Sequence, residues 1–323
     1  MRDEIRLYLT EEDIAYYTEL GINLDSDLLD PKVDRVFKAM FTADTKESKQ
    51  ALTDFLTSVL QRKVTEFTIK GNELAVRTLG EKQSSFDIHV AFDDTDEADI
   101  EMQIKIKDDL FSRSEYNTAK LYSTQELRGL HYGNLHKVYT IVILNQTLFP
   151  DTEDFHDEYM YRNGKGKVLS GNTQIIFIEL SKLDKILLKP VREMTPAEKW
   201  AVYLKYANHN DKRELIHEIL SSEEGIKMGA VALDAISRND DERVEYYHRL
   251  KYEMDMQSQV LYAESKGFEK GIEKGIEKGI EKGTSEATLN IAKKLLELNI
   301  PTEFIMTATG LPREEIEKLT LAK

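Results

Sequence analysis

Hydrophobic and polar residues alternate along two neighbouring stretches of the chain. In SSFDIHVAF (84–92) every second residue from Phe86 to Phe92 is apolar, and Asp87 lies between them. DIEMQIKI (99–106) alternates in the same way, with Glu101, Gln103 and Lys105 opposite its Ile and Met residues. Alternation with a period of two is typical of β-strands that have one apolar and one polar face. Because the acidic turn DDTDEAD (93–99) follows the first stretch, we expect an antiparallel hairpin, with Phe86 on the apolar face of its strand.

Helical periodicity surrounds this hairpin. Val33–Met40 and Glu47–Leu60 carry apolar residues at helical spacing, and a longer helix is expected from about Leu110 to Leu130. Two later stretches, KVYTIVIL (137–144) and TQIIFIEL (173–180), are apolar enough to be strands buried on both faces. Helix, hairpin, helix and strand in this order predict an α/β domain built from layers of helix and sheet.

Beyond Pro190 the apolar residues recur at helical spacing. The pattern runs through TPAEKWAVYLKYANH (195–209) and DERVEYYHRLKYEMDMQSQVLYAESKG (241–267), with no turn cluster inside either stretch. The expected fold class is therefore α/β, with an all-helical C-terminal region after the core. These shifts in pattern divide the chain into an N-terminal arm (1–29), an α/β domain (30–190), a helical region (191–265), a repeat (266–283) and a small three-helix unit (284–323).

The segment KGFEKGIEKGIEKGIEKG (266–283) repeats with a period of four. Its apolar residues form a stripe, and Lys is followed three positions later by Glu, which supports a helix. Glycine at every fourth position opposes it, because each costs about 1 kcal/mol relative to alanine. A second copy of the helix would bury the stripe, so we expect a helical linker that supports a homodimer. The alternative is a solvated connector.

The last segment resembles a small helix-turn-helix unit made of three short helices, with breaks at Asn299-Ile300-Pro301 and Gly310-Leu311-Pro312. A helix that reads DNA should present Arg, Lys, Asn or Gln to the bases. The final helix instead carries three Glu beside Arg313 and Lys318. A protein-interaction module is therefore at least as well supported as DNA recognition.

Composition narrows the classes of function. The 323-residue chain is 41% hydrophobic with 15 Tyr and 12 Phe, which excludes a disordered chain. It has no cysteine, which excludes disulfides, a cysteine nucleophile and a thiolate zinc site and fits a reducing cytoplasm, where we expect the protein to act. No apolar run approaches the roughly 18 residues of a membrane span, and the charged start MRDEIRLYLTEED is not typical of a signal peptide. We therefore expect no membrane partner.

Net charge argues against a dedicated nucleic-acid binder. The chain has 44 Lys and Arg against 59 Asp and Glu, a net charge of −15, whereas such proteins are usually basic. Net charge governs long-range attraction and not the chemistry of one site. The acidity therefore argues against tight non-specific DNA binding without excluding catalysis on DNA.

The polar face of the expected hairpin gathers groups that suit a hard metal ion. Glu101 and Gln103 point the same way because residues i and i+2 of a strand share a face. Pairing across the turn can set Asp87 beside them, since opposed Cβ atoms lie about 5 Å apart. Two carboxylates and a backbone carbonyl near Met102 would suit Mg²⁺, which keeps several waters, and such an ion activates a water that attacks a phosphodiester. Gln103, or Lys105 one step along, would orient that water or stabilise developing charge. On alternation alone, a solvated polar face is the stronger interpretation.

A resemblance to a known family favours the metal site over the solvated polar face. The chain resembles the Rpn family, the recombination-promoting nucleases also labelled transposases, within the PD-(D/E)XK nuclease superfamily. The resemblance runs from about Leu29 to Leu180, with one further block, and rests on DPKVDRVFKAMF, SFDIHV, IEMQ, FSRSEYNTAKLYSTQELRGLHYGNLHKVYTIVIL and WAVYLKY in that order. It implies a restriction-endonuclease-like core, which assigns the 30–190 domain to a PD-(D/E)XK nuclease.

The resemblance also implies functions for particular residues. The family's first-strand aspartate and E-x-Q fall on Asp87, Glu101 and Gln103, and the family has glutamine where the superfamily usually has lysine. Its D-x-x-F-K segment falls on Asp34 and Lys38, which the superfamily pattern puts on a helix near the site. Its R-x-x-Y falls on the residues that begin the next helix, Arg113 and Tyr116. These two either contact phosphate or serve as helix surface and core. Gln125, on the same helix, is better explained as an exposed helix residue, and His89 fits a half-buried strand position.

Two hypotheses follow. The first is a Mg²⁺-dependent DNA endonuclease, with Mn²⁺ as a substitute, that hydrolyses phosphodiester bonds in recombination, mobile-element or defence biology. The second is a catalytically silent protein that kept the nuclease fold and acts as an interaction module. The intact set of Asp87, Glu101 and Gln103 favours the first, and the net charge and acidic final helix favour the second.

Overall fold

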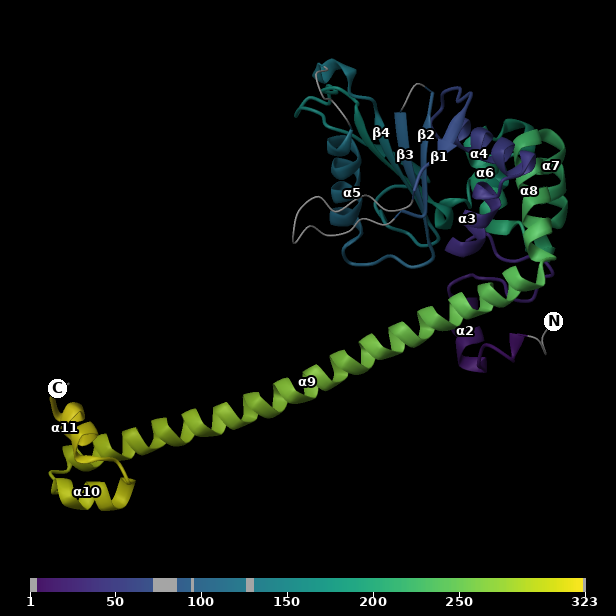
Figure 1. Ribbon diagram of the computed structural model, residues 1–323. Coiled ribbons are helices and arrows are strands. Elements are labelled where there is room, and N and C mark those ends of the chain that lie inside the picture. Colours follow the sequence, from purple (N-terminus) through teal and green to yellow (C-terminus); the bar gives the residue numbers. More distant parts are fainter. Residues whose placement is uncertain (1–4, 72–85, 94–95, 126–130, 322–323) are drawn as a thin grey trace. The chain divides into compact units, whose positions relative to one another are not determined.

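The centre of the fold is a mixed β-sheet (Figure 1). The computed structural model describes residues 5–71, 86–93, 96–125 and 131–321. Within these residues six strands form the sheet: β1 (Phe67–Ile69), β2 (Ile88–Phe92), β3 (Asp96–Gln103), β4 (Val138–Leu144), β5 (His156–Tyr159) and β6 (Thr173–Glu179). Their order across the sheet is β1-β2-β3-β4-β6-β5. The strands β3, β4 and β6 run parallel, and β1, β2 and β5 pair antiparallel with their neighbours.

The expected hairpin is formed by β2 and β3. Their register pairs Ile88 with Ile100 and Phe92 with Asp96, and residues 94–95 of the expected turn lie outside the described residues. Of the two buried strands expected from apolar composition, β4 is buried at every position, while β6 is buried only from Ile176 onwards. The α/β expectation is confirmed.

Two expectations about the ends of the hairpin strands are wrong. Strand β2 begins at Ile88, so Phe86 precedes it and does not follow its alternation. Phe86 packs against Leu121 and Val138, and so lies on the opposite face of the sheet from the apolar side chains of β2 with which it was expected. Similarly, β3 ends at Gln103, and Lys105 lies in an exposed bend. The chain turns there, and the amide of Ile106 donates to Gln146 Oε1 at 2.9 Å.

Helices cover both faces of the sheet (Figure 1). The helices of the described residues, whether or not they contact the sheet, are α2 (Glu11–Glu19), α3 (Asp34–Thr42), α4 (Lys46–Val59), α5 (Leu110–Thr124), α6 (Pro196–Tyr206), α7 (Arg213–Ser222), α8 (Glu224–Ser237), α9 (Asp240–Glu297), α10 (Thr302–Thr309) and α11 (Arg313–Leu321). Short 3-10 turns occupy Tyr132–Asn134, Leu180–Lys182, Ile186–Leu188, Val191–Glu193 and Asn210–Lys212. One face packs against α5 and the other against α3, while α6 and α8 pack behind α3 and α4. The helix expected to reach Leu130 ends at Thr124, and residues 126–130 lie outside the described part.

Close packing joins the helical layer to the core. The indole of Trp200 is buried beside Phe41 and Phe55 and donates to Asp54 Oδ2 at 2.8 Å. Helix α8 approaches α4 so closely at Gly225 that a Cβ there would lie 2.1 Å from Asp54 Cγ. Only glycine fits this contact, because real Cβ atoms do not approach other atoms so closely.

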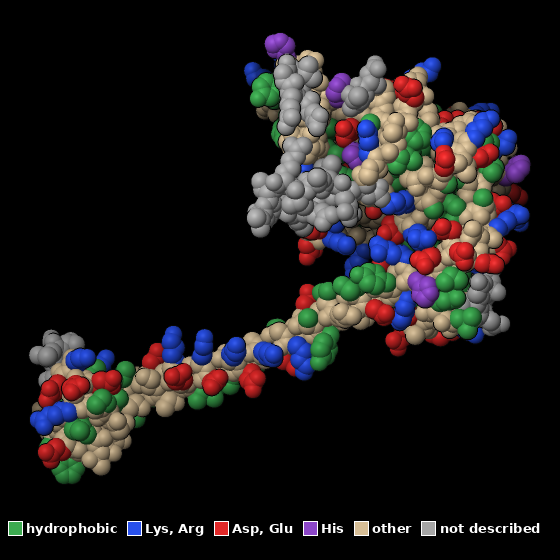
Figure 2. Space-filling view, in the orientation of Figure 1, with side chains coloured by type: hydrophobic (Ala, Val, Ile, Leu, Met, Phe, Trp, Pro, Cys, Tyr) green, Lys and Arg blue, Asp and Glu red, His purple; other side chains and the backbone are tan. Residues whose placement is uncertain are grey.

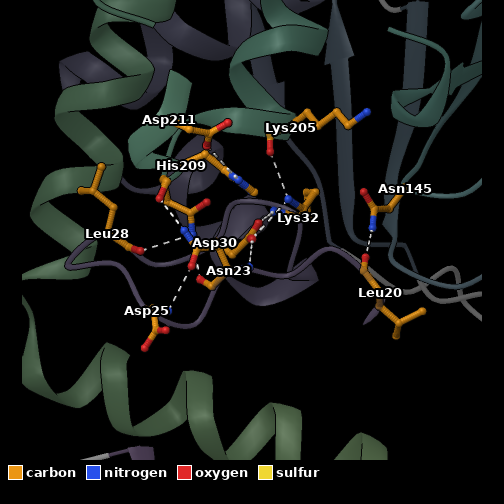
Figure 3. Close-up of polar contacts among 11 residues, drawn as sticks. Leu20, Asn23, Asp25, Leu28, Asp30, Lys32, Asn145, Lys205, His209 and Asp211 are labelled. Carbon is orange, nitrogen blue, oxygen red and sulfur yellow. Dashed lines mark hydrogen bonds and ion pairs between the residues drawn. The ribbon is translucent and has the colours of Figure 1, made fainter. Parts of the chain in front are cut away.

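Buried polar contacts anchor the N-terminal arm and the residues directly after it (Figure 3). Asp30 and Lys32 form an ion pair of 3.2 Å that is fully buried, and Lys32 Nζ also donates to the carbonyl of Lys205 at 3.0 Å. The Asn145 side chain donates to the carbonyl of Leu20. A buried pair is tolerated where each charge finds further hydrogen bonds, so these contacts hold the arm in one position against the core.

The chain divides into two compact parts, Met1–Tyr252 and Glu253–Lys323. The arm, the α/β domain and most of the first helical region lie in the first part. The second contains most of α9 and the helices α10 and α11, which pack around Ala292, Ile305 and Ile316. The helical C-terminal region is confirmed, but the first of its three expected short helices is the end of the continuous α9. Among the described residues, no helix is both long and apolar enough to cross a membrane.

Candidate active site

The hairpin brings Asp87 and Glu101 together. The register that pairs Ile88 with Ile100 sets Asp87 opposite Glu101 one position further on. Asp87 Oδ2 accepts a hydrogen bond from the backbone amide of Met102 at 3.2 Å. This contact fixes the aspartate although it precedes the first residue of β2.

Burial and like charge perturb this aspartate. Burial, and then the charges of Glu101 and Asp34, raise the pKa of Asp87 to about 7, while the Met102 amide and the Lys38 charge act in the opposite direction. Two carboxylates that repel each other in a site screened from water favour a bound cation or a proton between them. Such perturbed pairs are typical of functional sites.

Amide and guanidinium groups surround the other carboxylate. Glu101 is 6% exposed, and its Oε2 accepts from Gln103 Nε2 at 2.7 Å and from Arg113 Nη2 at 3.5 Å. Its Oε1 accepts from the buried Asn117 Nδ2 at 3.4 Å. Arg113 and Asn117 are one turn apart on α5, which follows β3 directly and covers this face of the sheet. The site is therefore assembled from consecutive elements.

Asp99 is a buried carboxyl that the sequence reasoning missed. It is fully buried on the same face of β3 as Glu101, and neither of its oxygens has a hydrogen-bond partner among the described residues. Burial, and then the charges of Glu101 and Asp87, raise its pKa well above the ordinary value and favour its neutral form. The signal was present, because Asp99, Glu101 and Gln103 share one parity along the strand. The role of Asn117 likewise follows from its i+4 spacing from Arg113.

The other site residues expected from the sequence lie on α3, on α5 and in the bend after β3. Asp34, at the start of α3, is held by Arg249 through contacts of 2.6 and 3.3 Å. Lys38, one turn further along α3, is half-buried. Tyr116 is 41% exposed on α5, with Lys120 Nζ 5.9 Å from its ring centre. Lys105 lies in the exposed bend after β3, so strand alternation does not place it on the same face as Glu101 and Gln103.

Two further polar residues have partners of their own. Gln125 exchanges hydrogen bonds with the backbone of His136 at 2.9 and 3.0 Å. His89 Nε2 lies 2.8 Å from Glu97 Oε2. Both residues therefore have structural contacts outside the Asp87–Glu101 pair.

The two facing carboxylates are the groups of the site that suit a metal ion. Among the described residues, no group of three or more His, Asp or Glu side chains is arranged to hold one. Mg²⁺ nevertheless binds through one or two carboxylates, with water and substrate oxygens as its other ligands. The facing, mutually repelling Asp87 and Glu101 fit that requirement.

Comparison with known proteins gives one match. The model of the PD-(D/E)XK nuclease family transposases matches residues 31–263. Searches of curated proteins and of solved structures found no match. The matched segment contains the hairpin, α5 and the helices behind the sheet, so it covers the whole candidate site and confirms the resemblance read from the sequence. It supports a nuclease-like or transposase function, and nucleases of this kind typically use divalent metal ions.

Proposed function

Because the chain belongs to the family of PD-(D/E)XK nuclease family transposases, we propose that it is a divalent-metal-dependent DNA endonuclease that hydrolyses phosphodiester bonds. One observation carries the proposal: Asp87 and Glu101 face each other across the hairpin, and burial and mutual repulsion raise the pKa of Asp87 to about 7. The hydrogen-bond donors are unequally divided: Gln103 and Asn117 donate to Glu101, whereas Asp87 accepts from the Met102 amide.

We assign Asp87 and Glu101 as the ligands of Mg²⁺, with Mn²⁺ as a substitute. A divalent ion bound there would polarise the phosphodiester and lower the pKa of the water that attacks phosphorus. In that hydrolysis a new bond forms between the water oxygen and phosphorus, one phosphorus–oxygen ester bond breaks, and the leaving oxygen takes up a proton. The protein holds the two carboxylates in position for this reaction.

The groups around Glu101 would act as positioning residues. Gln103 donates to the oxygen that Arg113 also approaches, and Asn117 donates to the other oxygen. Together they restrict the rotation of the carboxylate. When DNA is bound, Arg113 is also close enough to the pair to contact a phosphate, and Tyr116 lies one turn further along the same helix.

We further propose that the protein is a homodimer joined through the repeat in α9. The repeat isoleucines (Ile272, Ile276 and Ile280) and Phe268 are between 48% and 72% exposed, and Figure 2 shows rows of Lys and Glu along the same helix. A Cβ at Gly267, Gly271, Gly275, Gly279 or Gly283 would meet no atom within 4 Å, which leaves room for a close partner. A two-fold pair would present two active sites to the two strands of a duplex.

A second candidate function rests on the charge. At −15 the chain would be repelled by DNA at long range, as expected of a silent nuclease fold that binds another protein. A link to recombination or mobile elements comes from the family alone.

Incubating the purified chain with supercoiled plasmid separates the two candidates. An endonuclease converts the plasmid to nicked or linear forms with Mg²⁺ or Mn²⁺ and leaves it intact with EDTA. Asp87→Ala and Glu101→Ala should abolish cutting and leave the fold intact, whereas Glu115→Ala, on the exposed surface of α5, should cut like the parent. Uncut plasmid with both metals would favour the silent interaction protein.

A further inference from the structure

The segment that joins β5 to β6 has the opposite charge to the chain as a whole. Residues 159–178 contain Arg162, Lys165 and Lys167 but no Asp or Glu, whereas the net charge of the chain is −15. All three cationic residues are exposed. Within the part of the chain that the structure describes, no ion pair involves them, and the two lysines donate hydrogen bonds from their backbone amides. Their charged groups are therefore available to an anionic ligand.

These cations lie on a short hairpin, the basic hairpin (Tyr161–Leu169). Arg162 pairs antiparallel with Val168, and the amide of Leu169 donates to the carbonyl of Tyr161 at 2.9 Å. The two arms of the basic hairpin thus form a narrow two-stranded ribbon that extends beyond the ends of β5 and β6.

The turn of the basic hairpin is fixed by its own side chain and backbone. Asn163 Oδ1 accepts hydrogen bonds from the amides of Lys165 and Lys167 at 2.9 and 3.0 Å. Gly166 has a φ of +81°, which glycine adopts at little cost and other residues rarely adopt. Because the backbone is already ordered, a ligand of the turn loses little affinity to ordering it.

The basic hairpin lies away from the carboxylate pair. Strand register sets Glu101 level with Val142, Phe177 and then Asp157. From Asp157 the chain runs antiparallel to β6, away from the end of the sheet where β3 finishes. Lys165 follows eight positions later, so at about 3.3 Å per residue the turn lies up to about 25 Å along the strand direction. A ligand that reaches both places must be long, and about seven base pairs of duplex cover this distance at about 3.4 Å each.

The side chains of the basic hairpin fit a row of phosphates better than a lipid surface. Its turn, residues 163–167, contains no apolar side chain, whereas insertion into a membrane interface requires one. The exposed Tyr161 and Leu169 lie at the other end of the basic hairpin, 68% and 80% exposed. Arg and Lys are the usual partners of DNA phosphates, and the major groove admits a two-stranded β-ribbon.

We propose that the basic hairpin anchors duplex DNA, with Arg162, Lys165 and Lys167 bound to backbone phosphates several base pairs from the scissile position. This inference rests on the proposed nuclease function, which supplies the duplex. The basic hairpin provides local attraction that the net charge of −15 does not. It lowers the DNA concentration needed for half-maximal cutting and takes no part in the chemical step.

Binding of a duplex of about 30 base pairs in EDTA, which prevents cutting in this scheme, tests the proposal on the full chain. Changing Arg162, Lys165 and Lys167 to Ser should weaken binding at least about tenfold at about 50 mM salt. The slope of log K against log salt concentration should fall by about 2–3, because each phosphate contact contributes about 0.9. Lys165→Arg with Lys167→Arg keeps the charge and should bind like the parent.

The matched control removes three exposed cations elsewhere and so changes the net charge by the same amount. These cations each have a carboxylate partner, and the control changes all of them to Ser: Lys185, Lys227 and Arg238. The control should bind the duplex within about threefold of the parent, because surface ion pairs add little to stability and these cations contact no phosphate in this scheme. Both triple variants should keep the thermal unfolding midpoint of the parent.

Cleavage of plasmid with Mg²⁺ completes the test. The basic-hairpin variant should have a raised KM and a kcat within about threefold of the parent. Binding like the parent, a loss no larger than in the control, or a fall in kcat at unchanged KM would overturn the inference, as would hairpin-dependent binding to phosphatidylserine vesicles without binding to DNA. A parent that binds the duplex through the basic hairpin but does not cut with Mg²⁺ or Mn²⁺ would refute the nuclease proposal and leave the DNA contact standing.

Discussion

Replacing Asp87 with asparagine is expected to stabilise the folded chain in the absence of metal, and increasingly so towards alkaline pH. The substitution removes one of two facing charges and keeps an oxygen that can accept the Met102 amide, now at 3.2 Å from Asp87 Oδ2. Because the folded-state pKa of about 7 lies above the ordinary 3.8, the folded protein holds this proton more tightly than the unfolded chain. That stabilising contribution is complete below about pH 4 and is lost as the pH rises through 7.

The magnitude follows from the same two values. At about 1.4 kcal/mol for each pH unit, the interval between 3.8 and about 7 gives an upper limit of about 4 kcal/mol. Local relaxation and water at this partly buried site reduce it, so we expect a gain of about 2–4 kcal/mol at alkaline pH. The gain should grow by up to about 1.4 kcal/mol per pH unit between about pH 4 and 7 and then become constant.

Urea unfolding in EDTA at several pH values measures this difference. Fluorescence of Trp200, the single tryptophan, reports on the first part of the chain because the indole is buried against Phe41 and Phe55. The control is Asp108→Asn, which removes an exposed carboxylate from the segment between β3 and α5 and should change the free energy of unfolding little at any pH. A gain that does not depend on pH, or a loss at alkaline pH, would refute the reasoning about the paired carboxylates.

Added metal provides a second arm of the experiment. If Asp87 is a ligand, Mg²⁺ at about 100 times its Kd should stabilise the parent by about 2.7 kcal/mol. The asparagine variant should gain much less at the same concentration. Equal stabilisation of both proteins would mean that the ion binds elsewhere.

Three further outcomes are expected. Gln103→Ala should lower turnover by about 100-fold with little change in the Mg²⁺ concentration for half-maximal activity, and a loss of metal affinity as large as that of Asp87→Ala would make Gln103 a ligand. Gly225→Ala should destabilise the first part by about 1–3 kcal/mol, because its Cβ would meet Asp54. In contrast, Gly271→Ala, which meets no atom within 4 Å, should stabilise α9 by up to about 1 kcal/mol, and equal effects at the two glycines would contradict the packing argument. Changing all three repeat isoleucines to serine should convert a dimer to a monomer in sedimentation at micromolar concentration and shift double-strand cutting towards single nicks, and a monomeric parent would disprove the dimer.

The sequence was sufficient for the central part of the site because strand alternation is a local property. The period of two aligned Glu101 with Gln103, and antiparallel pairing then set Asp87 opposite Glu101. Alternation did not predict where the strands end. The alternation in the sequence continues to Lys105, but the strand stops at Gln103, because hydrogen bonding with Gln146 from a distant loop decides where the chain turns.

Long-range packing limited the prediction elsewhere. No local pattern shows that Arg249 binds Asp34 across 215 positions, or that Lys38 consequently has no ion-pair partner among the described residues. Asp99 was missed for a different reason. Its polar identity was visible, but its complete burial depends on α5 covering the hairpin, which tertiary structure determines.

The contacts that close the N-terminal region have a consequence for how the protein is synthesised. Tyr17 donates to the carbonyl of Leu250, 233 positions later, and Asp34 is bound by Arg249. These bonds cannot form until the beginning of α9 has left the ribosome. The first part, Met1–Tyr252, is therefore closed by contacts between its own two ends, and its folding during synthesis cannot finish before nearly all of that part has emerged.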